Sequence, residues 1–140
     1  KAAKIIVGDR NFGGGSSREG APWALLDYGF RCIVASSFGD IFYNNSLKNG
    51  LLPIRLSEGV VTGIRMQLHE NPGSTITVDL DAQAVTAPNG ALHKFDIEPF
   101  RKQSLLKGLD DIGMTFEHNK EIDEFENGFR QRRPWLFAEA

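Results

Sequence analysis

The spacing of apolar residues predicts alternating strands and helices in the first part of the chain. Residues 4–7 (KIIV) and 31–36 (RCIVAS) are short runs rich in β-branched residues, with the length of buried strands. Between them, residues 22–28 have the apolar spacing of a helix, and Gly29 follows as a stop signal. The order strand, helix, strand predicts a parallel pair joined by a right-handed crossover.

The same alternation continues through residue 73. Residues 38–47 predict a second helix ending near Gly50, and residues 51–56 (LLPIRL) predict a third strand. Ser57 is a candidate N-cap of a third helix, which closes at residues 71–73 (NPG). One apolar stripe runs along that helix: Val60, Val61, Ile64 and Leu68.

Beyond residue 73 the pattern changes to strict alternation. Residues 75–80 alternate polar and apolar side chains, which predicts a half-solvated strand, and Asn89-Gly90 is a two-residue hairpin signal. From Pro99 the chain is helical in pattern, with a break at Gly108 and an acidic stretch at residues 121–127 (EIDEFEN). The expected fold is α/β, with a mostly parallel core sheet, an antiparallel hairpin and C-terminal helices, in one domain over residues 1–140.

Composition narrows the classes of function. The chain has 140 residues, 41% of them hydrophobic, a net charge of −2 and a pI near 5.9. It can therefore bury a core, and because lysine and arginine form no dense stripe, nucleic-acid and membrane-surface roles are not expected. The single cysteine, Cys32, forms no internal disulfide, and without a long apolar run we expect a cytoplasmic protein. The chain begins at Lys1 without methionine, so we expect an upstream portion to have been removed.

A glycine-rich stretch at residues 11–25 (NFGGGSSREGAPWAL) carries the candidate chemistry. A glycine loop between a strand and a helix allows close approach of a ligand, and the amides at a helix start favour an anion. The stretch has neither the lysine of a P-loop nor the spacing of a dinucleotide fingerprint or nucleophile elbow. Ser16 and Ser17 offer hydroxyls and Arg18 a guanidinium suited to a carboxylate, so an organic acid is the predicted ligand.

A structural role for the same residues stays open at this point. Ser16 and Glu19 have the spacing of a capping box. A regular helix beginning at Ser16 would place Pro22 in its second turn, where proline is unfavourable. We therefore expect a turn or 3₁₀ segment over residues 16–20 and an α-helix that starts near Pro22.

Two blocks of the sequence resemble a known family. NFGGGSSREGAPWALLDYGF and ASSFGDIFYNNSLKNGLLPI, with the later NPG, GLDDIG and RRPWL, are similar to the small subunits of 3-isopropylmalate dehydratase, members of the aconitase superfamily in leucine biosynthesis. The resemblance implies a swivelling β/β/α domain of the aconitase last-domain type. It also implies a large subunit as partner, a [4Fe-4S] cluster carried by that subunit, and a small dicarboxylic hydroxy acid as substrate.

The resemblance also assigns roles to residues. Ser16 matches the serine that acts as catalytic base, and Arg18 matches the arginine that binds a substrate carboxylate. Ser17 and Gly15 are expected to bind substrate beside them. The implied reaction is a hydro-lyase isomerisation of 2-isopropylmalate to 3-isopropylmalate through an alkene.

Two positions depart from the family pattern. Gly20 stands where related chains read histidine, and Gly14 where cysteine is common. Gly14 is a mild change between small residues, whereas Gly20 removes any hydrogen bond of the histidine. Gly20 also leaves an idle assembly subunit open. Two other functions stay open as well: the small subunit of another aconitase-type hydro-lyase, acting on homoaconitate or a methylated malate or citrate, and an isolated anion-binding module.

The remaining candidates are expected to be structural. The three histidines are far apart, so no metal site is expected in this chain, and Cys32 is expected to be a buried small hydrophobe. Phe12 and Trp23 are expected in the core. Asn44 and Asn45 either line the site or end a helix. The arginines at 130, 132 and 133 are expected to form a solvated or subunit-facing tail.

Overall fold

The computed structural model describes residues 3–15, 17–109 and 111–137, apart from the side chains of Asp111 and Met114. The chain divides into two compact units, Lys1–Gly108 and Leu109–Ala140. The expectation of one domain over residues 1–140 stays a prediction.

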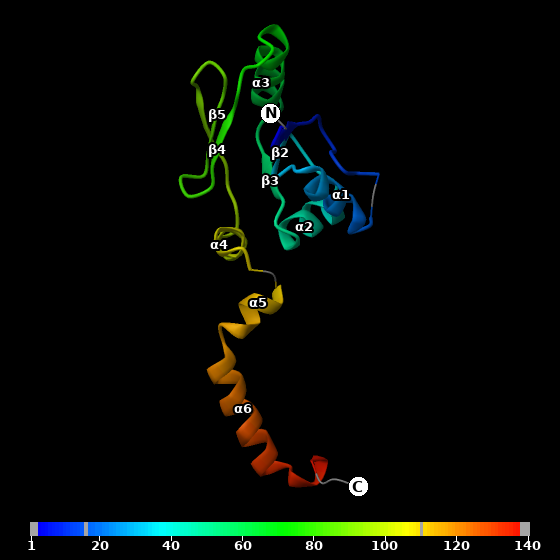
Figure 1. Ribbon diagram of the computed structural model, residues 1–140, viewed down its shortest axis with the longest axis vertical. Coiled ribbons are helices and arrows are strands. Elements are labelled where there is room, and N and C mark those ends of the chain that lie inside the picture. Colours follow the sequence, from blue (N-terminus) through cyan, green and yellow to red (C-terminus); the bar gives the residue numbers. More distant parts are fainter. Residues whose placement is uncertain (1–2, 16, 110, 138–140) are drawn as a thin grey trace. The chain divides into compact units, whose positions relative to one another are not determined.

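A parallel sheet lies at the centre of the first unit (Figure 1). Its three strands run in the order β1 (Ile5–Val7), β2 (Cys32–Ala35) and β3 (Leu52–Arg55), and both pairings are parallel. β2 lies in the middle and is buried along its whole length, as its continuous apolar run predicts. Pro53 lies in β3, at an edge of this sheet, where its missing N–H costs no ladder bond.

Helices cover both faces of the parallel sheet. α1 (Gly20–Tyr28) and α2 (Asp40–Lys48) pack on one face, where Ile33 and Ala35 join Phe38, Phe42 and Leu51 in a buried cluster. α3 (Glu58–Glu70) packs on the other face through the predicted stripe, with Val61 and Ile64 fully inside. Because side chains alternate along β2, successive residues of this strand pack into two separate hydrophobic clusters, one on each face of the sheet.

A second, antiparallel sheet joins the α3 side of the core. Its strands are β4 (Thr77–Asp79), β5 (Ala84–Thr86) and β6 (Leu92–Lys94), in the order β4-β5-β6. The expected hairpin is thus the second half of a three-stranded sheet. Its turn is also one residue longer than predicted, because Ala87 and Ala91 are joined by a backbone hydrogen bond and Gly90 takes a φ of 84°. A three-residue loop with glycine in the left-handed region gives the same reversal.

Helices complete both units. α4 (Pro99–Lys107) ends at Gly108 with a φ of 66°, as the predicted break requires. The second unit contains α5 (Asp111–Phe116), α6 (Asn119–Arg132) and a 3₁₀ turn at Pro134–Leu136. The α/β class with a parallel sheet, an antiparallel part and C-terminal helices is confirmed. Among the described residues, no helix has the length and apolar character needed to span a bilayer.

The start of α1 differs from the prediction. The helix begins at Gly20 with Glu19 as its N-cap, two residues before the expected start at Pro22. Pro22 therefore occupies the third helical position, where the N–H has no intrahelical partner to lose. Glu19, the N-cap residue, makes no side-chain capping bond. The capping box that the spacing allowed involves Ser16, which lies outside the described residues.

Candidate functional site

The loop after β1 is fastened to the segment after β2. The Phe12 amide donates to the Ser37 carbonyl at 3.0 Å, and the Gly39 amide donates to the Phe12 carbonyl at 3.0 Å. The Asn11 amide donates to the Ser37 hydroxyl oxygen at 2.7 Å. These bonds extend the parallel pairing of β1 and β2 beyond the strands, so the glycine loop starts from a fixed point.

An ion pair fastens the beginning of the same loop to α3. The carboxylate of Asp9 accepts from the Arg10 amide at 2.8 Å and from the Arg65 guanidinium at 2.9 Å. The hydrogen bond from the Arg10 amide, and then the one from Arg65, lower the pKa of Asp9 below its ordinary value. Both side chains are solvent-exposed, so this pair orients the loop more than it stabilises the fold.

The glycines of the loop are required by their neighbours. Gly13 has a φ of 72°, and a Cβ atom there would lie 2.2 Å from the ring of Phe42. A Cβ atom on Gly39 would lie 2.8 Å from the Cα atom of Gly14. The loop backbone therefore lies directly against the N-terminus of α2, at a distance that side chains would prevent. At Gly14 the nearest atoms belong to the side chain of Asn11, so a cysteine at this position would require Asn11 to move.

A small pocket opens where the loop meets α2. Its volume is about 260 Å³, and its lining consists of Gly13, Gly14, Ser17, Gly39, Asp40, Ile41 and Phe42. Gly39 is the N-cap of α2 and offers no side-chain cap, so the first-turn amides of α2 have no partner from that side chain. The pocket therefore combines a hydroxyl, glycine backbone and a helix N-terminus, the groups that bind an anion. Asp40 adds a carboxylate to the lining, which opposes a second negative charge there.

The predicted site residues are placed as follows. Ser16 lies outside the described residues. Ser17 lines the pocket, whereas Gly15 and Arg18 are exposed and are not among its lining residues. The Arg18 carbonyl accepts from the Ala21 amide at 3.3 Å, which fixes the backbone of Arg18 to the first turn of α1. Ser17 and Arg18 therefore lie in the loop just before α1, beyond the carboxyl end of β1.

The sequence reasoning missed the contribution of residues 39–42. It expected the anion-binding amides at the helix that follows the glycine loop, which is α1. The structure instead presents the N-terminus of α2 to the loop. The available signal was topological, because ligands of parallel sheets bind outside the carboxyl ends of adjacent strands, and residues 37–39 follow β2 as the loop follows β1.

Gly20 has room for a side chain. A Cβ atom there meets no other atom within 4 Å, and its backbone is in the ordinary helical region at the start of α1. Nothing in its surroundings requires glycine. The departure from histidine at this position is therefore not imposed by packing.

The other candidate residues, Cys32, Phe12 and Trp23, have structural roles. Cys32 is buried in β2, and burial raises the pKa of its thiol to about 12. Phe12 packs against Phe38 and Phe42, as expected of a core ring. Trp23 does not: about half of it is exposed, and its indole N–H donates to the Asn49 side chain at 2.7 Å. The prediction of a core position was wrong for Trp23 because an indole can lie on a surface when its N–H finds a partner.

The asparagines of α2 lie inside the helix. Asn44 donates from its side chain to the Asp40 carbonyl at 3.0 Å, and the carbonyl of Asn45 accepts from the Asn49 amide at 3.1 Å. Asn49 rather than either of them occupies the C-cap. Neither Asn44 nor Asn45 lines the pocket at the glycine loop.

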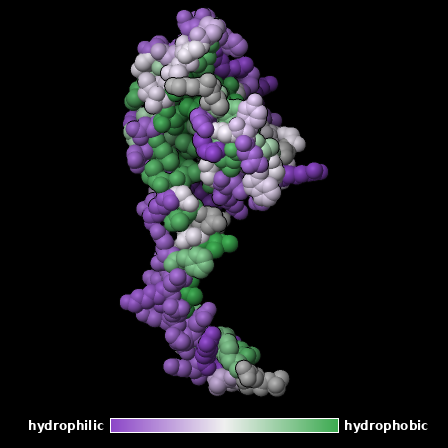
Figure 2. Space-filling view, in the orientation of Figure 1, coloured by the Kyte–Doolittle hydropathy of each residue, from purple (hydrophilic) through white to green (hydrophobic). Residues whose placement is uncertain are grey.

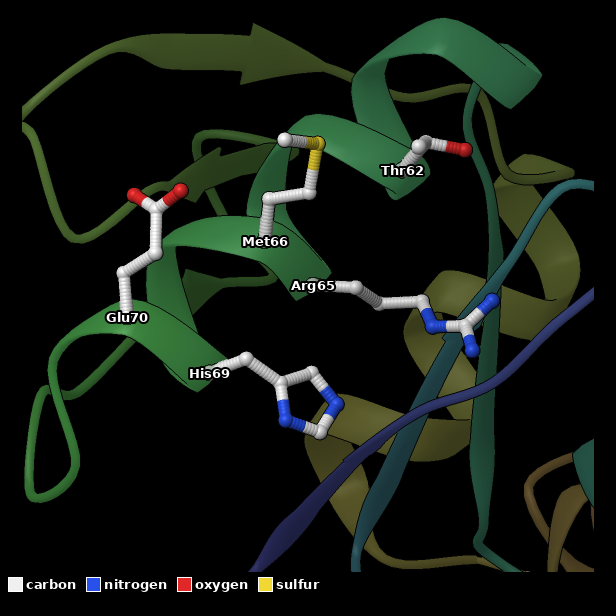
Figure 3. A pocket seen from close by; sticks show the side chains of 5 residues that line it. All are labelled: Thr62, Arg65, Met66, His69 and Glu70. Atoms are coloured by element: carbon white, nitrogen blue, oxygen red, sulfur yellow. The ribbon is translucent and has the colours of Figure 1, made fainter.

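Another pocket lies along the outer face of α3 (Figure 3). All five lining residues come from this one helix: Thr62, Arg65, Met66, His69 and Glu70. Arg65 and His69 extend to the same side of α3, whereas Met66 and Glu70 point away from them. Within the described part of the chain, no three His, Cys, Asp or Glu side chains are placed to hold a metal ion.

The fold and loop define the class of protein, and three family models match successive parts of the chain. Residues 1–59, which include the parallel sheet and the glycine loop, match the model described as Aconitase C-terminal domain. Residues 66–99 match a model described as LeuD_N, and residues 111–139 match a model of the C-terminal domain of the 3-isopropylmalate dehydratase small subunit. The first part of the chain thus matches the C-terminal domain of aconitase, and its last part matches the small subunits of 3-isopropylmalate dehydratase.

Curated relatives identify the family. The chain is 50% identical over 135 residues to a 3-isopropylmalate dehydratase small subunit of Rhodopseudomonas palustris, covering 96% of this chain and 67% of that protein. It is 49% identical over 138 residues to one of Saccharophagus degradans, covering 99% of this chain and 64% of that protein. The chain belongs to the family of 3-isopropylmalate dehydratase small subunits, and it spans about two thirds of the length of these relatives.

A solved structure has the same fold. The crystal structure of 3-isopropylmalate dehydratase from Methanocaldococcus jannaschii superposes with a TM-score of 0.66 at 27% sequence identity. The match covers 89% of this chain and 70% of that one. The expected fold of the aconitase type is therefore confirmed.

Proposed function

We propose that this chain acts as the small subunit of a 3-isopropylmalate dehydratase and isomerises 2-isopropylmalate to 3-isopropylmalate in leucine biosynthesis. The observation that carries the proposal is the glycine loop, which is held against the N-terminus of α2 and opens a pocket at Ser17. The family of the chain gives this loop its chemistry. As a small subunit it requires a large subunit, and the complete site lies between the two chains in this proposal.

The reaction is a dehydration followed by a rehydration. A base removes a proton from carbon, the hydroxyl on the neighbouring carbon takes up a second proton from an acid group of the complete site and leaves as water, and an alkene remains. The same acid group takes its proton back when water is added. Water then adds with its hydroxyl on the other carbon, so no oxidant or reductant is consumed. The base is the alkoxide of Ser16, which takes the proton in the first half and returns it in the second.

The neighbours of Ser16 explain how a serine can do this. A serine hydroxyl is a weak base unless its anion is stabilised. In the proposal, the first-turn amides of α2 and the cationic side chain of Arg18 supply that stabilisation. Arg18 also binds one substrate carboxylate with its planar guanidinium, and Ser17 and the Gly15 amide hold the substrate beside it. Asp40 lines the pocket and its carboxylate repels a second negative charge, so in the proposal the substrate carboxylate binds away from Asp40.

The iron–sulfur chemistry of the family comes from the partner. A [4Fe-4S] cluster needs several cysteine thiolates, whereas this chain has one cysteine, and that one is buried in β2. The residues of this chain therefore do not fit the cluster, and we place it on the large subunit. We likewise place the complex in the cytoplasm, as the leucine pathway implies.

The test is turnover of 2-isopropylmalate by this chain mixed anaerobically with a cluster-loaded large subunit, followed through the absorbance of the alkene. We expect Ser16→Ala to lose turnover by at least about 10²-fold, the scale of a catalytic base, while binding to the large subunit is retained. Ser57→Ala, in which the side chain makes no capping bond, is the matched control and should keep full turnover. If the unaltered chain forms a complex with the large subunit but this complex does not turn over 2-isopropylmalate, the proposal is contradicted.

Gly20→His tests whether the departure from the family pattern limits the activity. Because the position has open space and an ordinary backbone, we expect the variant to fold with a free energy of unfolding changed by no more than about 1 kcal/mol. We expect its turnover to rise above that of the unaltered chain. A variant that binds the large subunit but gains nothing would favour an assembly role for the chain.

A further inference from the structure

The pocket at the glycine loop has two sides, one formed by the loop and one by the start of α2. Gly13, Gly14 and Ser17 line it from the loop, and residues 39–42 line it from α2. Its volume of about 260 Å³ is below the roughly 300–1,000 Å³ of a site that encloses a whole small ligand. Arg18, which binds a substrate carboxylate in the proposed function, is not among the lining residues. The pocket therefore has room for one substituent of a substrate whose carboxylate is bound by Arg18.

Ile41 gives the α2 side of the pocket an apolar surface. About half of this side chain is exposed, whereas the next residue, Phe42, is buried in the core. Figure 2 shows hydrophobic residues among hydrophilic ones on the surface of the first unit, so exposure by itself does not mark Ile41. Its place in the pocket does, because an apolar group that enters the pocket removes the surface of Ile41 from water. This side therefore favours an alkyl substituent.

Asp40 gives the same side a negative charge. It is the first residue of α2, where the helix dipole favours a carboxylate, so the dipole accounts for the residue type. The repulsion of a ligand depends only on where the Asp40 carboxylate lies, and Asp40 lines the pocket. Among the described residues that line the pocket, none is a lysine or an arginine. A carboxylated substituent would therefore meet a like charge there and no opposite one.

We infer that Asp40 and Ile41 select the substituent of the substrate: Ile41 contacts an alkyl group, and Asp40 rejects a carboxylate in its place. This inference rests on the proposed function and deepens it, because the substrates that the sequence left open differ in this group. The isopropylmalates carry a branched alkyl group, a methylated malate carries a smaller one, and homoaconitate carries a third carboxylate. Contact with Ile41 favours isopropyl over methyl, and repulsion by Asp40 disfavours the third carboxylate.

The experiment compares three malates that carry isopropyl, methyl or carboxyethyl at the same carbon. The enzyme is the complex of this chain with a cluster-loaded large subunit. Each compound is characterised by kcat/KM for formation of its alkene, or by its inhibition constant against 2-isopropylmalate where turnover is too slow to follow. The readout is the ratio between two compounds on one complex, because a partly loaded or partly folded preparation leaves a ratio of kcat/KM values unchanged. We expect the unaltered complex to prefer the isopropyl compound.

Asp40→Asn removes the charge and keeps the size of the side chain. We expect the ratio of the carboxyethyl to the isopropyl compound to rise at least about tenfold, because like charges placed together strongly disfavour binding. Asp40→Glu keeps the charge and should keep the low ratio. Glu58→Gln is the matched control, because Glu58 is the exposed first residue of α3 as Asp40 is of α2. It should leave the ratio unchanged.

Ile41→Ala shortens the apolar side chain at the pocket. We expect the ratio of the isopropyl to the methyl compound to fall about tenfold, the lower end of the effect of one carbon atom in a hydrophobic pocket, because Ile41 is only partly buried. Met66→Ala is the matched control, since Met66 is 56% exposed against 53% for Ile41 and lies on α3, outside the lining of this pocket. It should leave the ratio unchanged.

Three results would overturn the inference. The first is a ratio of carboxyethyl to isopropyl compound that is the same in Asp40→Asn and Glu58→Gln. The second is an Ile41→Ala complex that loses kcat/KM for the isopropyl and methyl compounds by the same factor. The third is an unaltered complex that prefers the carboxyethyl compound, which would leave the hydro-lyase class standing. A complex inactive on all three compounds would instead contradict the proposed function itself, and the inference with it.

Discussion

The absence of a side chain at Gly13 shapes the candidate site more directly than any other single residue. Gly13→Ala would force a Cβ atom into the ring of the buried Phe42 and hold alanine at a φ of 72°. The left-handed backbone alone costs about 1–2 kcal/mol for a residue with a Cβ, and the contact with Phe42 adds to it. We expect the urea midpoint to fall accordingly. Gly15→Ala, where the added Cβ meets nothing within 4 Å, is the control and should unfold like the unaltered chain.

A result with both alanine variants equally stable would contradict the placement of the loop on α2. The need for glycine at position 13 could be predicted only in part from the sequence. Three successive glycines indicated a tight loop, but which of them was needed depended on Phe42, 29 positions further on.

Cys32 gives a prediction about pH. Because its pKa is raised from 9.0 to about 12 in the folded chain, the folded state keeps its thiol proton over a range in which the unfolded state loses it. The stability present below pH 9 is therefore lost as pH rises toward 12, by up to about 1.4 kcal/mol per pH unit from this group. Cys32→Ala should flatten that alkaline slope in urea titrations, although it is less stable at neutral pH.

The same burial predicts the reactivity of the thiol. At pH 8 the native chain should not react with a disulfide reagent, and one thiol per chain should react in urea. Rapid modification of the native chain would show that β2 opens to solvent. The sequence predicted this buried place correctly, because a cysteine within a continuous apolar strand has no exposed face.

At the scale of elements, α2 connects the core to the site. Phe42 is 2% exposed and packs against Phe12 and Phe38, while its neighbour Ile41 is 53% exposed and lines the pocket. Phe42→Ala should cost about 3–5 kcal/mol in the free energy of unfolding. Ile41→Ala should cost far less. Chemical denaturation of both variants checks this, and equal losses would mean that α2 is not seated through Phe42.

Most elements could be predicted because their periodicity is local. The buried strands, the stripe of α3 and the glycine stops at residues 29 and 108 all follow from residues a few positions apart. The errors occurred where a neighbour outside the element decided. Trp23 lies on the surface because Asn49 accepts its N–H, and the turn of the predicted hairpin has three residues rather than two because Ala87 is bonded to Ala91.

At the scale of the whole molecule, both hydrophobic clusters belong to the first unit. All the side chains of these clusters come from residues 5–105. We therefore expect a chain ending at Gly108 to retain a cooperative urea transition, with a lower m-value because less surface is exposed on unfolding. Loss of the cooperative transition in the shortened chain would show that the second unit is needed for the core.

The sequence by itself determined the α/β class, the family and the identity of the loop residues 15–18, because apolar periodicity and the two long motifs are properties of contiguous residues. Only the tertiary structure decided that the N-terminus of α2 faces this loop and that Asp40 and Ile41 share a pocket with Ser17. The physical reason is that parallel pairing brings together the ends of β1 and β2, which are about 30 positions apart in the chain. No local pattern records which helix start will lie beside which loop.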